Sequence, residues 1–338
     1  MVTLTAHYLV VLAMVAAGVM VRFGAVAAPY LVSTRIGVPG SPGQSDSASF
    51  DEPNGIVRWG NSTSPLSLIV VDTRNHALRL IVVASGGTKT FAGALGSNGA
   101  VDGLTFTSAR FNGPTAIAYA LSASVLLVSD TGNHQLRELS LQKGNVTTVA
   151  GHVPRLGGSE NGVGVAAGFL DPFGLAASLP SGDTIFVADS RNNMIRAMNM
   201  TSYNVTTLAG STATNWNDAA DGADARFSRP RGVVYAIVSG TAFLFVADAF
   251  NHVIRRVNVA TTEVTTIAGM GSSPGSLDGG GSLAQFRQPQ GLLLAELGQE
   301  SFVLLVVDTG NHAVRAVNLT STAVTTVSGV MGVSSGTN

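Results

Sequence analysis

One pattern of about 59 residues occurs five times in this 338-residue chain. Each copy has an aspartate, then an asparagine followed in four copies by a histidine, and then an arginine three positions after the histidine position. The aspartates are 58, 59, 59 and 60 residues apart. The repeated residues are Asp72, His76 and Arg79; Asp130, His134 and Arg137; Asp189 and Arg196; Asp248, His252 and Arg255; and Asp308, His312 and Arg315. A repeat of this length predicts an array of similar structural units.

Two further signatures keep the same register in every copy. A Phe-x-x-Pro motif opens each copy, and a Thr-x-Ala-Gly motif, or Thr-x-Ser-Gly in the fifth copy, closes it. Between them lie four short alternating or β-branched runs, which in the fourth copy are residues 232–236, 242–247, 252–259 and 263–268. Such runs, separated by Gly, Asn and Ser turns, are typical of antiparallel strands. Four strands in each radial repeat form one blade of a β-propeller. The 40 glycines and the 12% of charged residues argue against a helical bundle.

The copies resemble NHL repeats, which are named for an Asn-His-Leu core. That core appears as Asn75-His76 with Leu78, Asn133-His134 with Leu136, Asn251-His252 with Ile254, and Asn311-His312 with Val314. The third copy has Asn192-Asn193 where the histidine is expected. The resemblance covers residues 50–329. It implies an all-β, NHL-type β-propeller whose four-stranded antiparallel blades lie at about residues 50–93, 111–151, 169–210, 227–269 and 286–329.

The sequence allows more than one number of blades. The family usually closes six blades, whereas this chain has five complete copies. Residues 32–37 resemble the outer strand of a blade whose three inner strands are missing, so residues 28–49 are expected to be an outer strand and linker. Only nine residues, 330–338, follow the last copy as a tail. Five blades close alone, or the six-bladed ring is incomplete, or a partner fills the gap; we favour five-bladed closure.

The N-terminus has the pattern of a targeting segment. Residues 8–21 carry no charge, and Ala25-Val26-Ala27 offers the small-x-small pattern that signal peptidases accept. We expect residues 1–27 to be a signal peptide. The alternative is a membrane anchor through residues 8–28, although the uncharged run is shorter than the roughly 20 residues of a spanning helix. The mature protein is accordingly expected to be secreted or on the cell surface, with a membrane attachment only if the leader is not cleaved.

Charge and cysteine content exclude several kinds of function. With 19 Lys and Arg against 20 Asp and Glu, the net charge is −1, which argues against nucleic acid as a partner. The absence of cysteine excludes disulfides, thiolate zinc sites and cysteine nucleophiles. We expect no cofactor.

The repeated Asp, His and Arg residues are expected to be structural, because copies spread around a propeller cannot converge on one substrate. Function is expected where the blades differ. We call the end of each blade that carries the turn between its second and third strands the top, and we place the long connections between blades there. The candidate partner-binding residues at this end are Trp216, Arg226, Arg229, Arg231 and Arg287. Exposed aromatic and arginine side chains are typical of binding hot spots.

Five sequons of the form Asn-x-Ser/Thr lie in turns at the opposite, bottom end. Their asparagines are Asn61, Asn145, Asn199, Asn204 and Asn318. The repeat's own Val-Thr-Thr motif supplies some of the threonines, so part of this enrichment follows from the repeat. With a signal peptide, the pattern predicts a glycosylated bottom and a free top that binds a partner.

Two functions remain open at this level. The first is a non-enzymatic scaffold that presents its top to a protein or glycan, with a small-molecule substrate not expected. The alternative is a propeller hydrolase or lyase with a divalent cation at the central channel, as in enzymes that resemble NHL propellers. The carboxylates expected nearest to such a cation are Asp51, Glu52 and Asp171. No serine elbow, phosphate loop or zinc-helix motif occurs. We favour the binding scaffold.

Overall fold

The computed structural model describes residues 49–60, 66–153, 156–298 and 301–329. The predicted leader, the predicted N-terminal outer strand, Asn61 and the C-terminal tail lie outside these described residues. Among the residues that the structure describes, no helix is long and apolar enough to cross a membrane.

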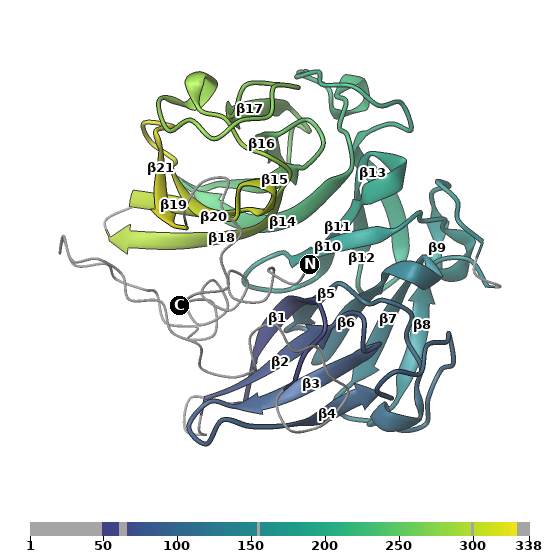
Figure 1. The fold of residues 1–338 in the computed structure, drawn as a ribbon. Helices are drawn as coiled ribbons and strands as arrows, with labels where there is room; N and C mark the ends of the chain where they lie inside the picture. The colour runs from purple at the N-terminus through teal and green to yellow at the C-terminus, as the bar shows by residue number, and fades with distance from the viewer. Residues whose placement is uncertain (1–48, 61–65, 154–155, 299–300, 330–338) are drawn as a thin grey trace. The chain divides into compact units, whose positions relative to one another are not determined.

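Five antiparallel sheets, each built on four consecutive strands, make up the described chain, and one of them gains a fifth strand, β9 (Gly162–Val163), from the connection before it (Figure 1). We refer to them as blades 1 to 5. Their strands are β1 (Pro53–Trp59), β2 (Ser67–Asp72), β3 (Ala77–Val82) and β4 (Gly87–Gly93) in blade 1; β5 (Ala116–Ala120), β6 (Val125–Asp130), β7 (Gln135–Ser140) and β8 (Val146–Ala150) in blade 2; β10 (Pro172–Ala177), β11 (Thr184–Asp189), β12 (Met194–Asn199) and β13 (Asn204–Gly210) in blade 3; β14 (Pro230–Val238), β15 (Thr241–Asp248), β16 (Val253–Asn258) and β17 (Val264–Ala268) in blade 4; and β18 (Pro289–Gly298), β19 (Ser301–Asp308), β20 (Ala313–Asn318) and β21 (Val324–Ser328) in blade 5. The predicted all-β class and the four-stranded antiparallel blades are confirmed, and closure of the five blades remains a prediction.

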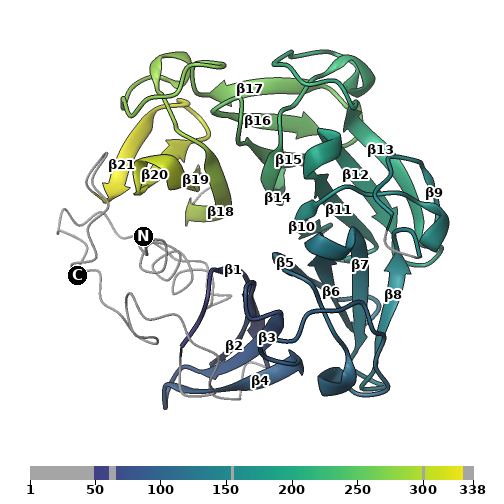
Figure 2. The ribbon, with the colours of Figure 1, turned by 45° about the vertical axis from the view of Figure 1, so that its right-hand side comes forward.

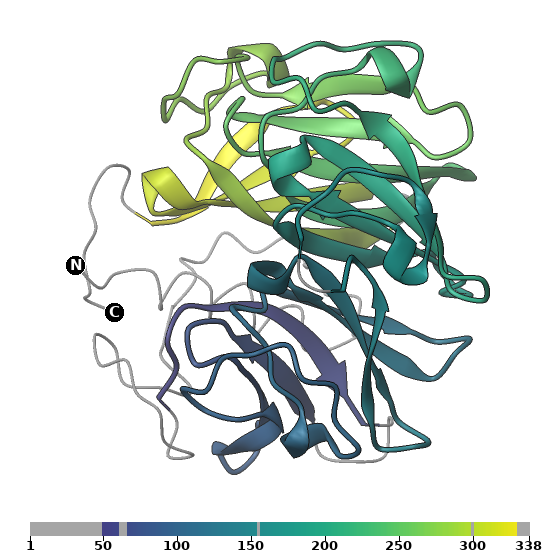
Figure 3. The ribbon, with the colours of Figure 1, turned by 90° about the vertical axis from the view of Figure 1, so that its right-hand side faces the viewer.

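The chain divides into two compact units, each with its own core. The first comprises residues 49–187 with 197–206, and the second comprises residues 188–196 with 207–329. The phenylalanine that opens each copy is buried in these cores, as Phe111 is in the first unit and Phe286 in the second. The second strand of a blade is buried on both faces, as the continuous burial along β2 and β6 shows, because neighbouring residues of a strand point to opposite faces. The strands of each sheet also twist along their length (Figure 3).

The long connections between blades run along the outer strand of the next blade. Gly103 pairs with Val146 at the start of β8, and Ala219 pairs with Val264 at the start of β17. The connection after blade 2 forms the short strand β9 (Gly162–Val163), which lies beside β13 (Figure 2). Because the outer strand starts at the bottom of a blade, the middle of each of these connections reaches the bottom. Placing the whole of each connection at the top was therefore wrong, since only their ends lie there.

Candidate functional site

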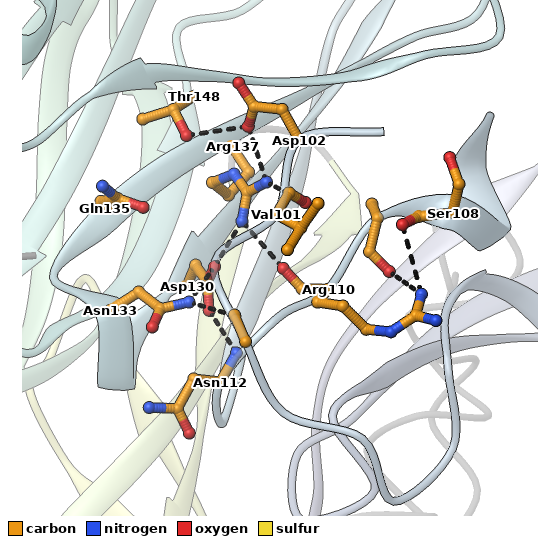
Figure 4. A network of polar contacts seen from close by, with 12 residues as sticks. Val101, Asp102, Ser108, Arg110, Asn112, Asp130, Asn133, Gln135, Arg137 and Thr148 are labelled. Atoms are coloured by element: carbon orange, nitrogen blue, oxygen red, sulfur yellow. Dashed lines mark hydrogen bonds and ion pairs between the residues drawn. The ribbon is translucent and has the colours of Figure 1, made fainter. Parts of the chain in front are cut away.

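The repeated aspartate and arginine form a buried ion pair in every blade. The five arginine side chains are completely buried, and each donates to the aspartate seven residues before it, at 2.8 to 3.1 Å. In blade 2, Asp130 also accepts hydrogen bonds from the Asn133 side chain and the Asn112 backbone N–H, both at 2.7 Å (Figure 4). Burial raises the pKa of Asp130 to about 6, although Arg137 opposes this shift. A carboxylate with three such donors joins two strands and a turn, which is a structural role.

A second carboxylate reaches this arginine from the connection between blades. Arg137 pairs with Asp102 at 2.8 Å, and the same Asp102 accepts a hydrogen bond from Thr148 of β8 (Figure 4). In the second unit, Arg255 pairs with Asp218 at 2.7 Å and Arg315 with Asp278 at 2.6 Å. Each of these arginines therefore holds a connection against the outer strand that it crosses. The sequence motif did not reveal this second partner, because it lies more than 30 residues before the arginine.

The repeated histidine links blades 1, 2 and 4 to the next blade along the chain. His76 Nδ1 accepts a hydrogen bond from the Gly113 N–H at 2.9 Å, and His252 Nδ1 accepts one from the Gln288 N–H at 3.1 Å. His134 makes the same contact with the Asp171 N–H at 3.1 Å. A neutral imidazole nitrogen without a proton is the acceptor in such a bond.

The third copy keeps this link although its histidine is replaced by Asn193. Asn193 Oδ1 accepts the Arg229 N–H at 2.9 Å, so an amide oxygen takes the role of the ring nitrogen. The position also has a left-handed backbone, with φ of 57° at Asn193 and 59° at His252. Asparagine and histidine are among the non-glycine residues that adopt this conformation most readily. The departure from the repeat is therefore conservative in both geometry and hydrogen bonding.

We expect this link to make stability depend on pH, because burial lowers the pKa of His76 and of His252, where the charge of Arg287 adds to the effect. The unfolded chain then binds protons more readily than the folded chain. The contribution of these histidines to the free energy of unfolding is complete above the unfolded pKa of about 6.5 and is lost as the pH falls below it. Urea unfolding at pH 7.5 and 5.5 measures how much the free energy of unfolding changes between these pH values. This change should be smaller for the His76→Asn/His252→Asn variant than for the wild type. Both proteins keep the buried aspartates with raised pKa, so an equal difference would contradict the prediction.

Three predicted arginines gather at the top of the second unit, at the starts of β14 and β18. The Arg229 guanidinium lies 4.8 Å from the centre of the Phe250 ring, and Arg231 donates to the Gln290 side chain at 2.9 Å. Arg287 lies beside His252, whose pKa its charge lowers. We call Arg229, Arg231, Arg287 and Phe250 the arginine cluster. Arg229 and Arg287 are exposed, and neither forms an ion pair with a carboxylate of the residues that the structure describes.

The other two predicted binding residues lie on the connection between blades 3 and 4. Arg226 donates to the backbone oxygens of Ala223 and Ala225, at 2.8 and 2.7 Å, so its guanidinium is turned back onto its own connection. Trp216 is 40% exposed, and its indole N–H donates to Thr266 Oγ1 at 2.9 Å. The structure thus holds Trp216 against β17 while leaving part of its ring accessible.

Trp216 is nevertheless close to the turn that carries Phe250. The backbone oxygen of Asn215 accepts a hydrogen bond from Asn251, at 2.7 Å, which connects the two segments at the top of blade 4. Phe250 is 38% exposed. The top of the second unit therefore presents two partly exposed aromatic rings beside exposed arginines, the combination that is enriched at binding hot spots.

Two of the three carboxylates considered for a cation site are engaged in other contacts. Glu52 forms an ion pair with Arg74 at 2.7 Å, and Asp171 lies 3.2 Å from His134. For Asp51 the structure gives a backbone contact, in which its N–H donates to the Asp72 side chain at 2.7 Å. Within the described ranges, no group of three or more His, Asp or Glu side chains is arranged to hold a metal ion.

The four described sequon asparagines lie at the turns between the third and fourth strands of their blades. Asn199 and Asn318 end β12 and β20, Asn204 begins β13, and Asn145 directly precedes β8. The fifth, Asn61, is outside the described residues. These turns are at the end of the blade opposite to the arginine cluster's end.

The repeats and the sheets that they form define an NHL-type β-propeller. No protein-family model matches the chain. It is 29% identical over 313 residues to NHL repeat-containing protein 2 of Bos taurus, covering 84% of this chain and 42% of that protein. It is 30% identical over 288 residues to the chloroplastic protein SUPPRESSOR OF QUENCHING 1 of Arabidopsis thaliana, covering 82% and 26%. The resemblance to NHL repeats is confirmed, and the chain spans less than half the length of these curated relatives.

Solved structures share the fold at low sequence identity. A structural-genomics protein from Bacteroides thetaiotaomicron matches with a TM-score of 0.60 and 18% identity, covering 89% of this chain and 64% of that one. A protein from Bacteroides ovatus described as an auxiliary nutrient binding protein matches with a TM-score of 0.54 and 17% identity, covering 83% and 71%. These similarities show a common propeller fold.

Proposed function

We propose that the chain is a secreted or cell-surface, non-enzymatic binding module whose partner is a protein or glycan that carries carboxylates. The observation that carries this proposal is the arginine cluster, in which Arg229 and Arg287 are exposed without a carboxylate from the described chain. A guanidinium binds a carboxylate through two parallel hydrogen bonds. Because Arg229 also stacks on Phe250, its planar group is held with an edge available for a ligand.

Two further observations support a binding role. Trp216 and Phe250 add partly exposed rings that can pack on a sugar or an apolar side chain. Solved propellers of this fold include proteins described as auxiliary nutrient binding proteins, so the fold is compatible with binding. The expected contribution of each arginine to affinity is that of a hydrogen bond to a charged group, about 1.5–3 kcal/mol.

The test compares two double variants with the same change in charge. Arg229→Gln/Arg287→Gln removes the exposed charges of the cluster, and Arg226→Gln/Arg256→Gln removes two arginines outside it. The probes are polygalacturonate as an acidic glycan, polyglutamate as an acidic peptide, and dextran as a neutral glycan. We expect the wild type and the control to bind at least one acidic probe and not dextran, and the cluster variant to bind it at least about tenfold more weakly. Equal affinities of the two variants, or equal binding of dextran, would refute the proposal.

A further inference from the structure

The last three blades share one turn geometry at the end of their third strand. Asn199, Asn258 and Asn318 end β12, β16 and β20, and the Oδ1 atom of each accepts backbone N–H groups from the residues two and three positions later. These bonds measure 3.0 and 2.9 Å at Asn199, 2.9 and 3.1 Å at Asn258, and 2.9 and 2.9 Å at Asn318. Blade 2 has Ser140 at this position and so lacks the amide.

Two of these three turns contain the glycosylation sequon, and one does not. Thr201 follows Asn199 by two residues and Thr320 follows Asn318, whereas Ala260 follows Asn258. The residue in this second position donates its N–H to the asparagine Oδ1 in all three turns, so its backbone is held next to the amide. The turn at Asn258 therefore has the same hydrogen bonds as the other two but lacks the threonine of a sequon.

The geometry also prepares the side-chain amide for reaction. Two N–H donors on Oδ1 draw electron density toward the oxygen, which makes a proton on Nδ2 easier to remove. Nδ2 of Asn199 and of Asn318 donates to no acceptor in the part of the chain that the structure describes. The Asn199 side chain is exposed and Asn318 is half-buried, and the threonines of both sequons, Thr201 and Thr320, are exposed. A polarised amide in an Asn-x-Thr sequon on a surface turn is suited to the transfer of a sugar to its nitrogen.

The other two described sequons are presented differently. Asn145 Oδ1 is buried and has no hydrogen-bond partner among the described residues. Asn204 is exposed like Asn199, but it is the first residue of β13, where it pairs with Val163 of β9 in an extended strand. Neither amide is held by N–H donors of its own sequon.

We propose that Asn199 and Asn318 are the N-glycan acceptors of the described chain, and that this turn distinguishes them from Asn145 and Asn204. The proposal rests on the predicted leader and is independent of the arginine cluster. In the transfer, Nδ2 forms a bond to the anomeric carbon of a lipid-linked oligosaccharide diphosphate. The bond from that carbon to the diphosphate oxygen breaks, the lipid diphosphate leaves, and Nδ2 loses one proton to the transferase. Both glycans would lie at the bottom of their blades.

The test expresses the full chain with its own N-terminus in eukaryotic cells. Glycosidase release in H₂¹⁸O, followed by peptide mapping, converts each occupied asparagine into a labelled aspartate. We expect label at Asn199 and Asn318 and much less at Asn145 and Asn204. Thr201→Ala and Thr320→Ala should each remove one glycan, and Ala260→Thr should add one at Asn258 because the turn is already present.

Three results would overturn the proposal. Occupancy of Asn145 or Asn204 equal to that of Asn199 and Asn318 would show that the turn does not select the acceptor. An unmodified Asn258 in the Ala260→Thr variant, with the other two sites occupied, would show the same. A chain without any glycan would exclude modification altogether, while binding of acidic probes would remain open to its own test.

Discussion

Replacing Arg255 by methionine is expected to lower the free energy of unfolding by about 3–5 kcal/mol. The substitution leaves the Asp248 carboxylate buried without the guanidinium that pairs with it at 3.0 Å. It also removes the pair with Asp218 at 2.7 Å, which holds the connection against β17. Methionine fills a similar length of the core, so the loss reports the uncompensated charge more than a cavity. Urea unfolding of the whole chain measures the change.

The neighbouring Arg256 provides the matched control. It lies on the same strand and stacks on the Phe243 ring at 5.0 Å, but it is only partly buried. Arg256→Met should therefore cost no more than the roughly 0.5–1 kcal/mol of an exposed cation–π contact. Adding Asp248→Asn to Arg255→Met removes the unpaired charge and should restore part of the stability. If Arg255→Met and Arg256→Met lower the free energy of unfolding equally, the buried ion pair is not the main source of the loss at Arg255.

Replacing Gly269 by alanine is expected to cost about 2–5 kcal/mol in unfolding free energy. Gly269 closes the fourth copy and has a φ of 104°, a conformation that L side chains rarely adopt. A Cβ atom there would lie 2.7 Å from the His252 oxygen and 2.9 Å from the Val253 Cα, which are backbone atoms that cannot move aside cheaply. The same requirement explains why the glycine of the Ala-Gly signature recurs in every copy.

The Gly240→Ala variant separates the cost of a positive φ from the cost of close contacts to the added Cβ atom. Gly240 also has a positive φ, of 78°, but a Cβ atom there would meet nothing within 4 Å. Its replacement should therefore cost only the roughly 1 kcal/mol of the left-handed backbone. Thermal unfolding of both variants gives the comparison. Equal losses would mean that the close backbone contact at Gly269 contributes nothing.

Local pattern was sufficient to predict the strands. In the fourth copy the sequence predicts strands at residues 232–236, 242–247, 252–259 and 263–268, and β14 to β17 overlap each of these runs. The structure extends the first strand back to Pro230 and forward to Val238. Strands separated by tight turns pair with their neighbours in the chain, so short-range signals carry most of the information.

The connections could not be predicted in the same way. Asp221-Gly222 is the conspicuous turn pair in its connection, yet Asp218 is the residue that pairs with Arg255. Asp221 instead caps the short helix η5 (Gly222–Asp224) by accepting the Ala223 N–H at 2.9 Å. In the other two connections the Asp-Gly pair does supply the carboxylate, as Asp102 before Gly103 and Asp278 before Gly279. Which carboxylate reaches the arginine therefore depends on how the connection crosses the outer strand, and the Asp-Gly pair alone does not identify it.

The repeat and the four strands of each blade could be predicted from the sequence alone, because they follow from short-range patterns of apolar, turn and β-branched residues. What each arginine contacts became clear only from the folded structure. Arg255 and Arg229 are both arginines of one copy, but the first lies in the core and the second beside Phe250 at the top. The folded structure also decided that Asn193 replaces a histidine without loss of the link to Arg229. These outcomes depend on contacts between residues far apart in the chain, which form only when the blades pack.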